Sequence, residues 1–137
     1  MRLAYFCFVA AALCGLAGMS LGIWMGMNED FTLAPVHAHI NLLGWVTLAL
    51  YGLYHRSVER EANRLASVQV GSAVLGTPLF AGGFAAALAT GAHTPAILVA
   101  GTAGIVLVLL GMVLFLAVLL TDFASRAPRR TPVPGAA

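Results

Sequence analysis

The chain has 137 residues, of which 61% are hydrophobic and only 9% are charged, with a formal net charge of +2. A soluble domain carries about 25% charged residues, so this chain has too few charges to cover a water-exposed surface. The small positive balance comes from arginines that flank apolar segments, and it therefore does not indicate a nucleic-acid partner.

Four apolar segments are long enough to cross a membrane. They cover residues 3–27, 36–54, 65–89 and 95–120. A transmembrane helix needs about 20 apolar residues, whereas a barrel strand needs only about 9–11. In lipid a helix satisfies its backbone hydrogen bonds internally. The sequence therefore predicts an all-α integral membrane four-helix bundle over residues 1–126, followed by a proline-rich, disordered cytoplasmic tail at 127–137.

The first segment is predicted to remain as a helix. Its N-terminal region holds only Arg2, its apolar stretch is longer than that of a signal peptide, and no small-residue cleavage box follows it. Gly18, Gly22 and Gly26 recur at four-residue spacing, which is typical of a ridge that lets another helix approach closely.

The arginines predict the orientation of the segments. Arg2 precedes the first segment. Three arginines lie between the second and third segments, and three follow the fourth: Arg56, Arg60 and Arg64, then Arg126, Arg129 and Arg130. The other two loops, 28–35 and 91–94, contain no Lys or Arg. Because basic residues accumulate in cytoplasmic loops, both termini are predicted to be cytoplasmic in a bacterial inner membrane.

The second segment opens with the most informative stretch, PVHAHINLLGW, at residues 35–45. Ionisable residues inside a membrane helix are expensive and often functional, so His37 and His39 are the leading candidates. Residues two apart on a helix point about 200° apart. The two imidazoles therefore cannot easily hold one ion, but they can serve two sites on opposite sides of the helix.

A planar cofactor between helices would suit this arrangement, with an imidazole as axial ligand. His37 and His39 are the predicted ligands of a haem b, and Asn41, Gly44 and Trp45 are its predicted contacts, since Gly44 would leave room for a ring system. A histidine near a helix end can also simply cap a carbonyl. We interpret the remaining histidines, His55 and His93, as surface residues.

The stretch from Val36 to Trp45 resembles the ligand-bearing helices of haem-copper oxidase subunit I. In that family an H-x-H pair binds two haems on opposite faces of one helix. The stretch is also similar to V-H-A-H-x-N-L-L-G-W in small four-helix bacterial proteins that are described as oxidase-like. The resemblance implies that this chain corresponds to one four-helix arc of the subunit.

The oxidase subunit has twelve helices in three such arcs, and its copper-site histidines and cross-linked tyrosine have no counterpart here. Oxygen reduction by this chain alone is therefore not expected. Three copies would supply twelve helices, which suggests a homotrimer with haem between neighbours, held by His37 of one protomer and His39 of the next. A dimer with one shared haem, or one protomer using His93, are the alternatives.

Three functions remain open at this point. The first is haem-based electron transfer or redox and gas sensing. The second is periplasmic-side copper handling by Met25, Met27, His37 and His39, because thioether and imidazole ligands suit Cu(I), with His93 as a further ligand. The third is a cofactor-free accessory subunit of a respiratory complex. The redox partner is not identified.

Overall fold

The structure, a computed structural model, describes residues 2–58 and 63–126, and these residues are helical apart from short connections. The helices are α1 (Arg2–Asn28), α2 (Ala34–His39), η1 (Ile40–Val46), α3 (Thr47–Ser57), α4 (Arg64–Thr90) and α5 (Pro95–Arg126). Since α2, η1 and α3 follow one another without a break, they form one second span, Ala34–Ser57.

Four helices are thus long and apolar enough to cross a membrane, which confirms the prediction of an all-α, multi-pass membrane protein. The fourth span extends further than expected, to Arg126 rather than Leu120. At 1.5 Å per residue its 32 residues reach about 48 Å, more than the roughly 30 Å of a bilayer's hydrocarbon core. The predicted tail at 127–137 lies outside the described residues.

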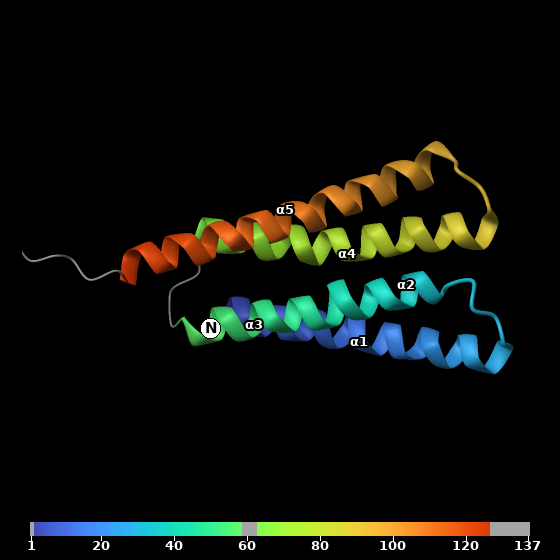
Figure 1. Ribbon diagram of the computed structural model, residues 1–137, viewed down its shortest axis with the longest axis horizontal. Coiled ribbons are helices and arrows are strands. Elements are labelled where there is room, and N and C mark those ends of the chain that lie inside the picture. Colours follow the sequence, from blue (N-terminus) through green and yellow to red (C-terminus); the bar gives the residue numbers. More distant parts are fainter. Residues whose placement is uncertain (1, 59–62, 127–137) are drawn as a thin grey trace, which may run out of the picture.

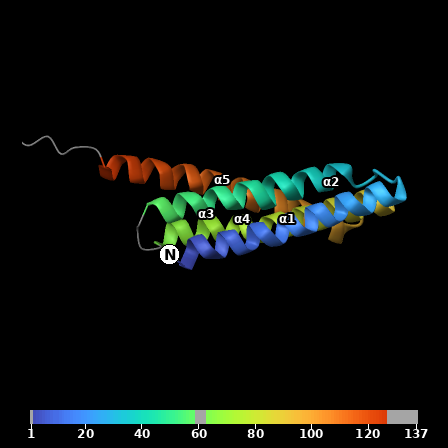
Figure 2. The same ribbon diagram turned by 90° about the horizontal axis from the view of Figure 1, so that it is seen from below.

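The four spans run along a common long axis as two hairpins (Figure 1, Figure 2). One hairpin pairs α1 with the second span, and the other pairs α4 with α5. Helix α4 joins the hairpins, because it contacts every other helix, whereas α5 packs mainly on α4. Towards the α4–α5 loop, α5 diverges from the rest of the molecule (Figure 1).

Small residues determine how closely the helices approach. The buried face of α1 recurs every three or four residues and consists almost wholly of small side chains: Ala4, Cys7, Ala11, Gly15, Gly18 and Met25. Between α4 and α5 the backbones nearly touch, since a Cβ at Gly83 would lie 2.5 Å from the Gly101 nitrogen. Such contacts replace the hydrophobic effect, which is weak between helices in lipid.

Large apolar side chains cover the outside of the helices. Leu13, Ile23 and Val99, for example, are each more than 60% exposed. Apolar patches of this extent are not tolerated on soluble monomers, because they would aggregate in water. This surface is suited to lipid.

The two ends of the molecule differ in charge. Arg2, Arg56 and Arg64 lie where α1 and α4 begin and α3 ends, which we call the arginine end (Figure 1). The opposite end, here the histidine end, carries the α1–α2 and α4–α5 loops. In the first of these loops, hydrogen bonds from Thr32 lower the pKa of the Asp30 carboxyl.

Candidate functional site

The second span changes helix type directly after the H-x-H pair. Residues Ile40–Val46 form a π-helix, with one more residue in each hydrogen-bonded turn than an α-helix. At its end the backbone N–H of Thr47 donates to the Leu42 carbonyl, and the Thr47 hydroxyl donates to the same oxygen at 2.8 Å. Such segments are rare and often mark functional sites. This one contains all three predicted cofactor contacts that follow the histidines.

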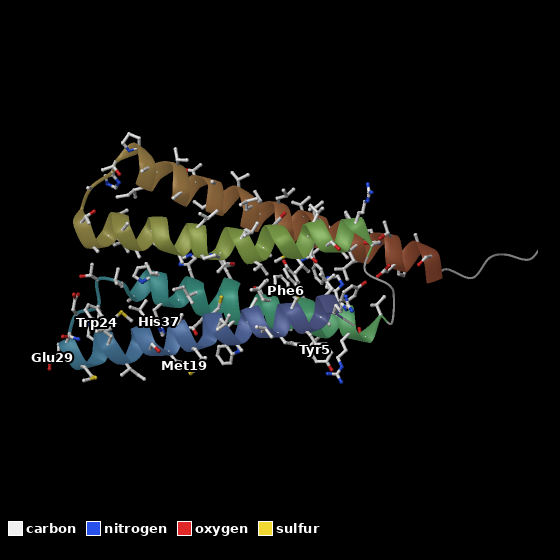
Figure 3. All side chains as sticks on the ribbon, turned by 180° about the vertical axis from the view of Figure 1, so that it is seen from behind. Tyr5, Phe6, Met19, Trp24, Glu29 and His37 are labelled. Carbon is white, nitrogen blue, oxygen red and sulfur yellow. The ribbon has the colours of Figure 1, made fainter. Side chains whose placement is uncertain are left out.

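His37 faces α1 within its own chain (Figure 3). Its Nδ1 lies 2.8 Å from the backbone oxygen of Gly18. Because a carbonyl oxygen can only accept, Nδ1 carries the proton and Nε2 keeps its lone pair. The ring lies against Gly22, where an added Cβ would be 2.8 Å from Cε1. Two α1 glycines thus fix both the position and the tautomer of this imidazole.

Asn41 and Trp45 continue the same contact along α1. The Asn41 amide donates to the His37 carbonyl at 2.9 Å, and its nitrogen lies 3.4 Å from Nε2 of His37. The Asn41 side chain packs directly on Gly18, where a Cβ would lie 2.6 Å from its Oδ1. The indole of Trp45 packs on Gly15 in the same way.

The predicted glycine ridge on α1 therefore packs against the second span, but it consists of a different set of glycines. Gly15 is added to Gly18 and Gly22, whereas Gly26 has nothing within 4 Å of the position of a Cβ.

His39 faces α4 instead, as the spacing of two residues predicts. Its Nδ1 lies 2.7 Å from the Pro35 carbonyl, so this nitrogen also carries the proton. Its imidazole makes T-shaped contacts with the rings of Phe80 and Phe84, with centroids 5.1 and 5.8 Å away, respectively. Within the described part of the chain, Nε2 of His39 makes no hydrogen bond.

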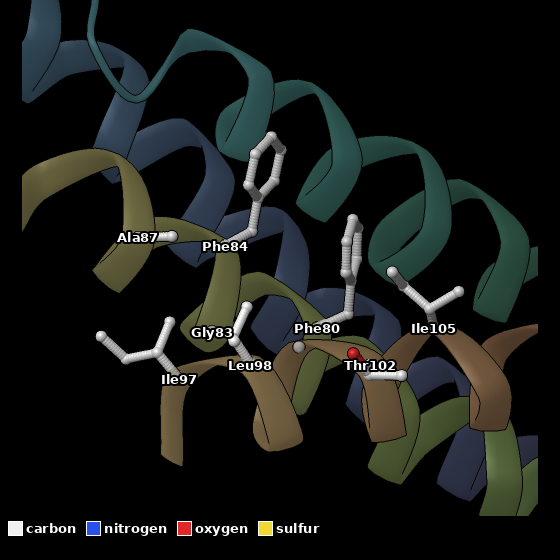
Figure 4. Close-up of a pocket in the computed structure, with 9 residues that line it drawn as sticks. Phe80, Gly83, Phe84, Ala87, Ile97, Leu98, Thr102 and Ile105 are labelled. Carbon is white, nitrogen blue, oxygen red and sulfur yellow. The ribbon is translucent and has the colours of Figure 1, made fainter. Parts of the chain in front are cut away.

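The two phenyl rings separate His39 from an apolar pocket between α4 and α5. Figure 4 shows them projecting from α4 on the side of the second span. The pocket behind them measures about 170 Å³, and Thr102 is its only polar side chain.

Gly44 does not provide the space that the sequence analysis assigned to it. A Cβ there would lie 2.6 Å from Cβ of Cys14 on α1 and 3.2 Å from a methyl group of Thr77 on α4. The residue is buried between the two helices. Its position is explained by close helix packing, and the room for a ring system at Gly44 is absent from this protomer.

The proposed copper ligands do not converge. Met25 is 4% exposed and Met27 is 80% exposed, so the two thioethers point in different directions. His93 is exposed in the α4–α5 loop. Over residues 2–58 and 63–126, no group of three or more His, Cys, Asp or Glu side chains could hold a metal ion.

A polar cluster near the arginine end was missed by the sequence analysis. His55, interpreted as a surface residue, is half-buried, and its Nε2 lies 2.9 Å from Oε1 of the fully buried Gln69. Tyr54 donates to the buried Asp122 at 2.7 Å, and Tyr51 contacts the sulfur of Met112 at 3.6 Å. Only the pairing of helices far apart in sequence brings these groups together.

The two imidazoles have the same hydrogen-bond arrangement at Nδ1. Both imidazoles donate Nδ1–H to a backbone carbonyl, which is common among metal-bound histidines. Nε2 of His37 lies 3.4 Å from the Asn41 amide nitrogen. The two rings face different helices, however, so one protomer does not offer two ligands to one iron. Comparison of the chain with protein-family models, curated proteins and solved structures found no match.

Proposed function

We propose that the protein binds haem b and transfers electrons, with His37 of one protomer and His39 of the next as axial ligands. The observation that supports this proposal is that Nδ1 of each histidine is hydrogen-bonded to a backbone oxygen. Each holds Nδ1–H on a main-chain oxygen, at 2.8 and 2.7 Å, which leaves Nε2 as the nitrogen that a metal would bind. At His37 the Asn41 amide, whose nitrogen lies 3.4 Å from Nε2, would have to turn away.

Two imidazole ligands favour electron transfer over gas binding. His37 and His39 would hold the haem, and a bound haem would supply a one-electron couple. The chain's own residues would orient the imidazoles through the Gly18 and Pro35 carbonyls. Phe80 and Phe84 would keep one side of His39 free of water.

The oligomer that we propose is a homotrimer. The two histidines face different helices, so in the proposed oligomer each protomer would serve two haems, each shared with a neighbour. A closed ring of such protomers satisfies every ligand, whereas an isolated chain satisfies none.

The proposed location is a bacterial inner membrane, with the arginine end in the cytoplasm. The positive-inside rule supports this orientation, because the described loops at the histidine end contain no Lys or Arg. The haem would then lie in the outer half of the bilayer.

Substitution of the histidines tests the proposal. We expect His37→Ala and His39→Ala each to lose most of the bound haem, because either change removes one ligand of every shared haem. His93→Ala, in an exposed loop at the same end, is the matched control and should retain it. Haem per chain is measured by pyridine haemochrome assay. Full haem and an unchanged spectrum in both ligand variants would overturn the assignment.

A further inference from the structure

Asn41, near the start of the π-helix, lies between the His37 ring and the backbone of α1. Its amide nitrogen Nδ2 donates to the His37 carbonyl at 2.9 Å. A Cβ added to Gly18 would be almost equally far from Oδ1, Nδ2 and Cγ of Asn41, at 2.6 to 2.8 Å. The amide therefore presents its face to this glycine. These two contacts hold the amide group beside the imidazole.

The second amide hydrogen of Asn41 is available to the imidazole itself, because an amide nitrogen carries two hydrogens. Nδ2 lies 3.4 Å from both ring nitrogens of His37. Nδ1 carries the proton that it donates to the Gly18 carbonyl, so only Nε2 can accept. At this distance the hydrogen bond is long and weak. It nevertheless engages the nitrogen that a metal would bind.

The other histidine of the pair has no such contact. Nδ1 of His39 lies 2.7 Å from the Pro35 carbonyl, and over residues 2–58 and 63–126 its Nε2 makes no hydrogen bond. The rings that it meets, Phe80 and Phe84, have no N–H or O–H to donate. The two histidines thus differ at Nε2, which is engaged by an amide in His37 and open in His39.

We propose that Asn41 controls access to Nε2 of His37, because its amide must turn away from the ring before iron can bind there. The proposal rests on the proposed function, in which His37 is a haem ligand. An Nε2 lone pair that binds iron cannot accept an amide hydrogen, so the two contacts exclude each other. His39, with its open Nε2, binds haem first, and His37 of the neighbouring protomer follows.

The reactivity of the imidazoles towards diethyl pyrocarbonate tests the shielding without haem. This reagent acylates the lone-pair nitrogen, and tandem mass spectrometry of the full chain, purified from a haem-limited host, maps the modified histidines. In the unmodified protein His37 should react more slowly than His39. We expect Asn41→Ala to raise the rate at His37 about three- to tenfold, the scale of one net hydrogen bond, and to leave His39 unchanged. Thr47→Val, which removes a different side-chain bond to a backbone oxygen of this span, should change neither rate.

Haem uptake by the same variants separates this proposal from the proposed function. Asn41→Ala should take up added haem faster than the unmodified protein by a similar factor, as followed by absorbance. An unmodified protein that takes up no haem would contradict the proposed function, and the role of Asn41 with it. Haem uptake by the unmodified protein, with His37 reactivity and uptake rate unchanged in Asn41→Ala, would overturn the role of Asn41 alone. An equal rise in reactivity at His37, His39 and His55 would also overturn it, because it would indicate a loosened fold.

Discussion

The imidazole of His37 is held by α1 from two directions. Gly18 accepts its Nδ1–H at 2.8 Å, and Gly22 allows the ring to lie directly on the α1 backbone. A side chain at either glycine would displace the ring or the Asn41 amide beside it. These glycines therefore act as positioning residues for the proposed ligand, and not only as helix-packing residues.

Substitution of Gly22 by alanine, which adds one methyl group, tests whether this glycine positions His37. In Gly22→Ala the new Cβ would be 2.8 Å from Cε1 of His37, so the ring must move, and overpacking of this kind costs about 1–3 kcal/mol. We expect lower haem content and a shifted spectrum. Gly26→Ala, whose Cβ has nothing within 4 Å, should behave like the unmodified protein. Identical spectra for the two variants would exclude a positioning role for Gly22.

Sequence alone predicts some of this site and misses the rest. The divergence of His37 and His39 follows from helical spacing and is found in the structure. The filling of the space at Gly44 by Cys14 and Thr77 depends on which helices become neighbours, and so does the Gln69 cluster. No local pattern in the second span specifies those partners.

Both ends of α4 carry capping residues that are favoured by local sequence. Asn63 precedes α4, and its side-chain oxygen accepts the backbone N–H of Ala66 at 2.8 Å. Gly91 ends the same helix in the left-handed conformation, at φ 62°, with its N–H on the Ala87 carbonyl. Both residues are the types that such caps prefer.

Removal of the first cap should weaken α4 measurably. In Asn63→Ala the Ala66 N–H loses its partner, so we expect a loss of about 1 kcal/mol of stability. Asn63→Ser, which can still accept this bond, is the matched control and should keep most of that stability. The readout is the thermal transition in detergent by circular dichroism. Equal transitions for the alanine and serine variants would contradict the capping role.

The spans themselves are predictable because hydropathy and length suffice to define them. The π-helix at Ile40–Val46 is not, since an apolar run of this composition is compatible with a regular α-helix. Within this segment Asn41 packs against Gly18 and Trp45 against Gly15, two glycines that are three residues apart on α1. This fit is a tertiary property.

At the scale of the whole molecule, the described arginines gather at one end, whereas the α1–α2 loop at the other end carries the acidic Glu29 and Asp30. The described loops at the histidine end lack Lys and Arg, while Arg2, Arg56 and Arg64 lie at the opposite end. The arginine bias supports the orientation proposed above.

Cysteine labelling in intact cells tests that orientation. In a background without Cys7 and Cys14, His93→Cys should react with a membrane-impermeant maleimide, because it lies in an exposed loop at the histidine end. Ser67→Cys, at an exposed position near the start of α4, should react only after lysis. The reverse pattern would mean that the arginine end faces outward.

The most direct test of the haem assignment is a reduced-minus-oxidised absorption spectrum. The chain is purified in mild detergent from a haem-replete host, with haem and oligomer mass measured on the same sample. Three protomers with two imidazoles each would hold about one bis-histidine haem per chain. We therefore predict sharp α and β bands on reduction and the mass of a trimer. A colourless, metal-free protein would contradict the haem assignment and leave the H-x-H pair a structural role.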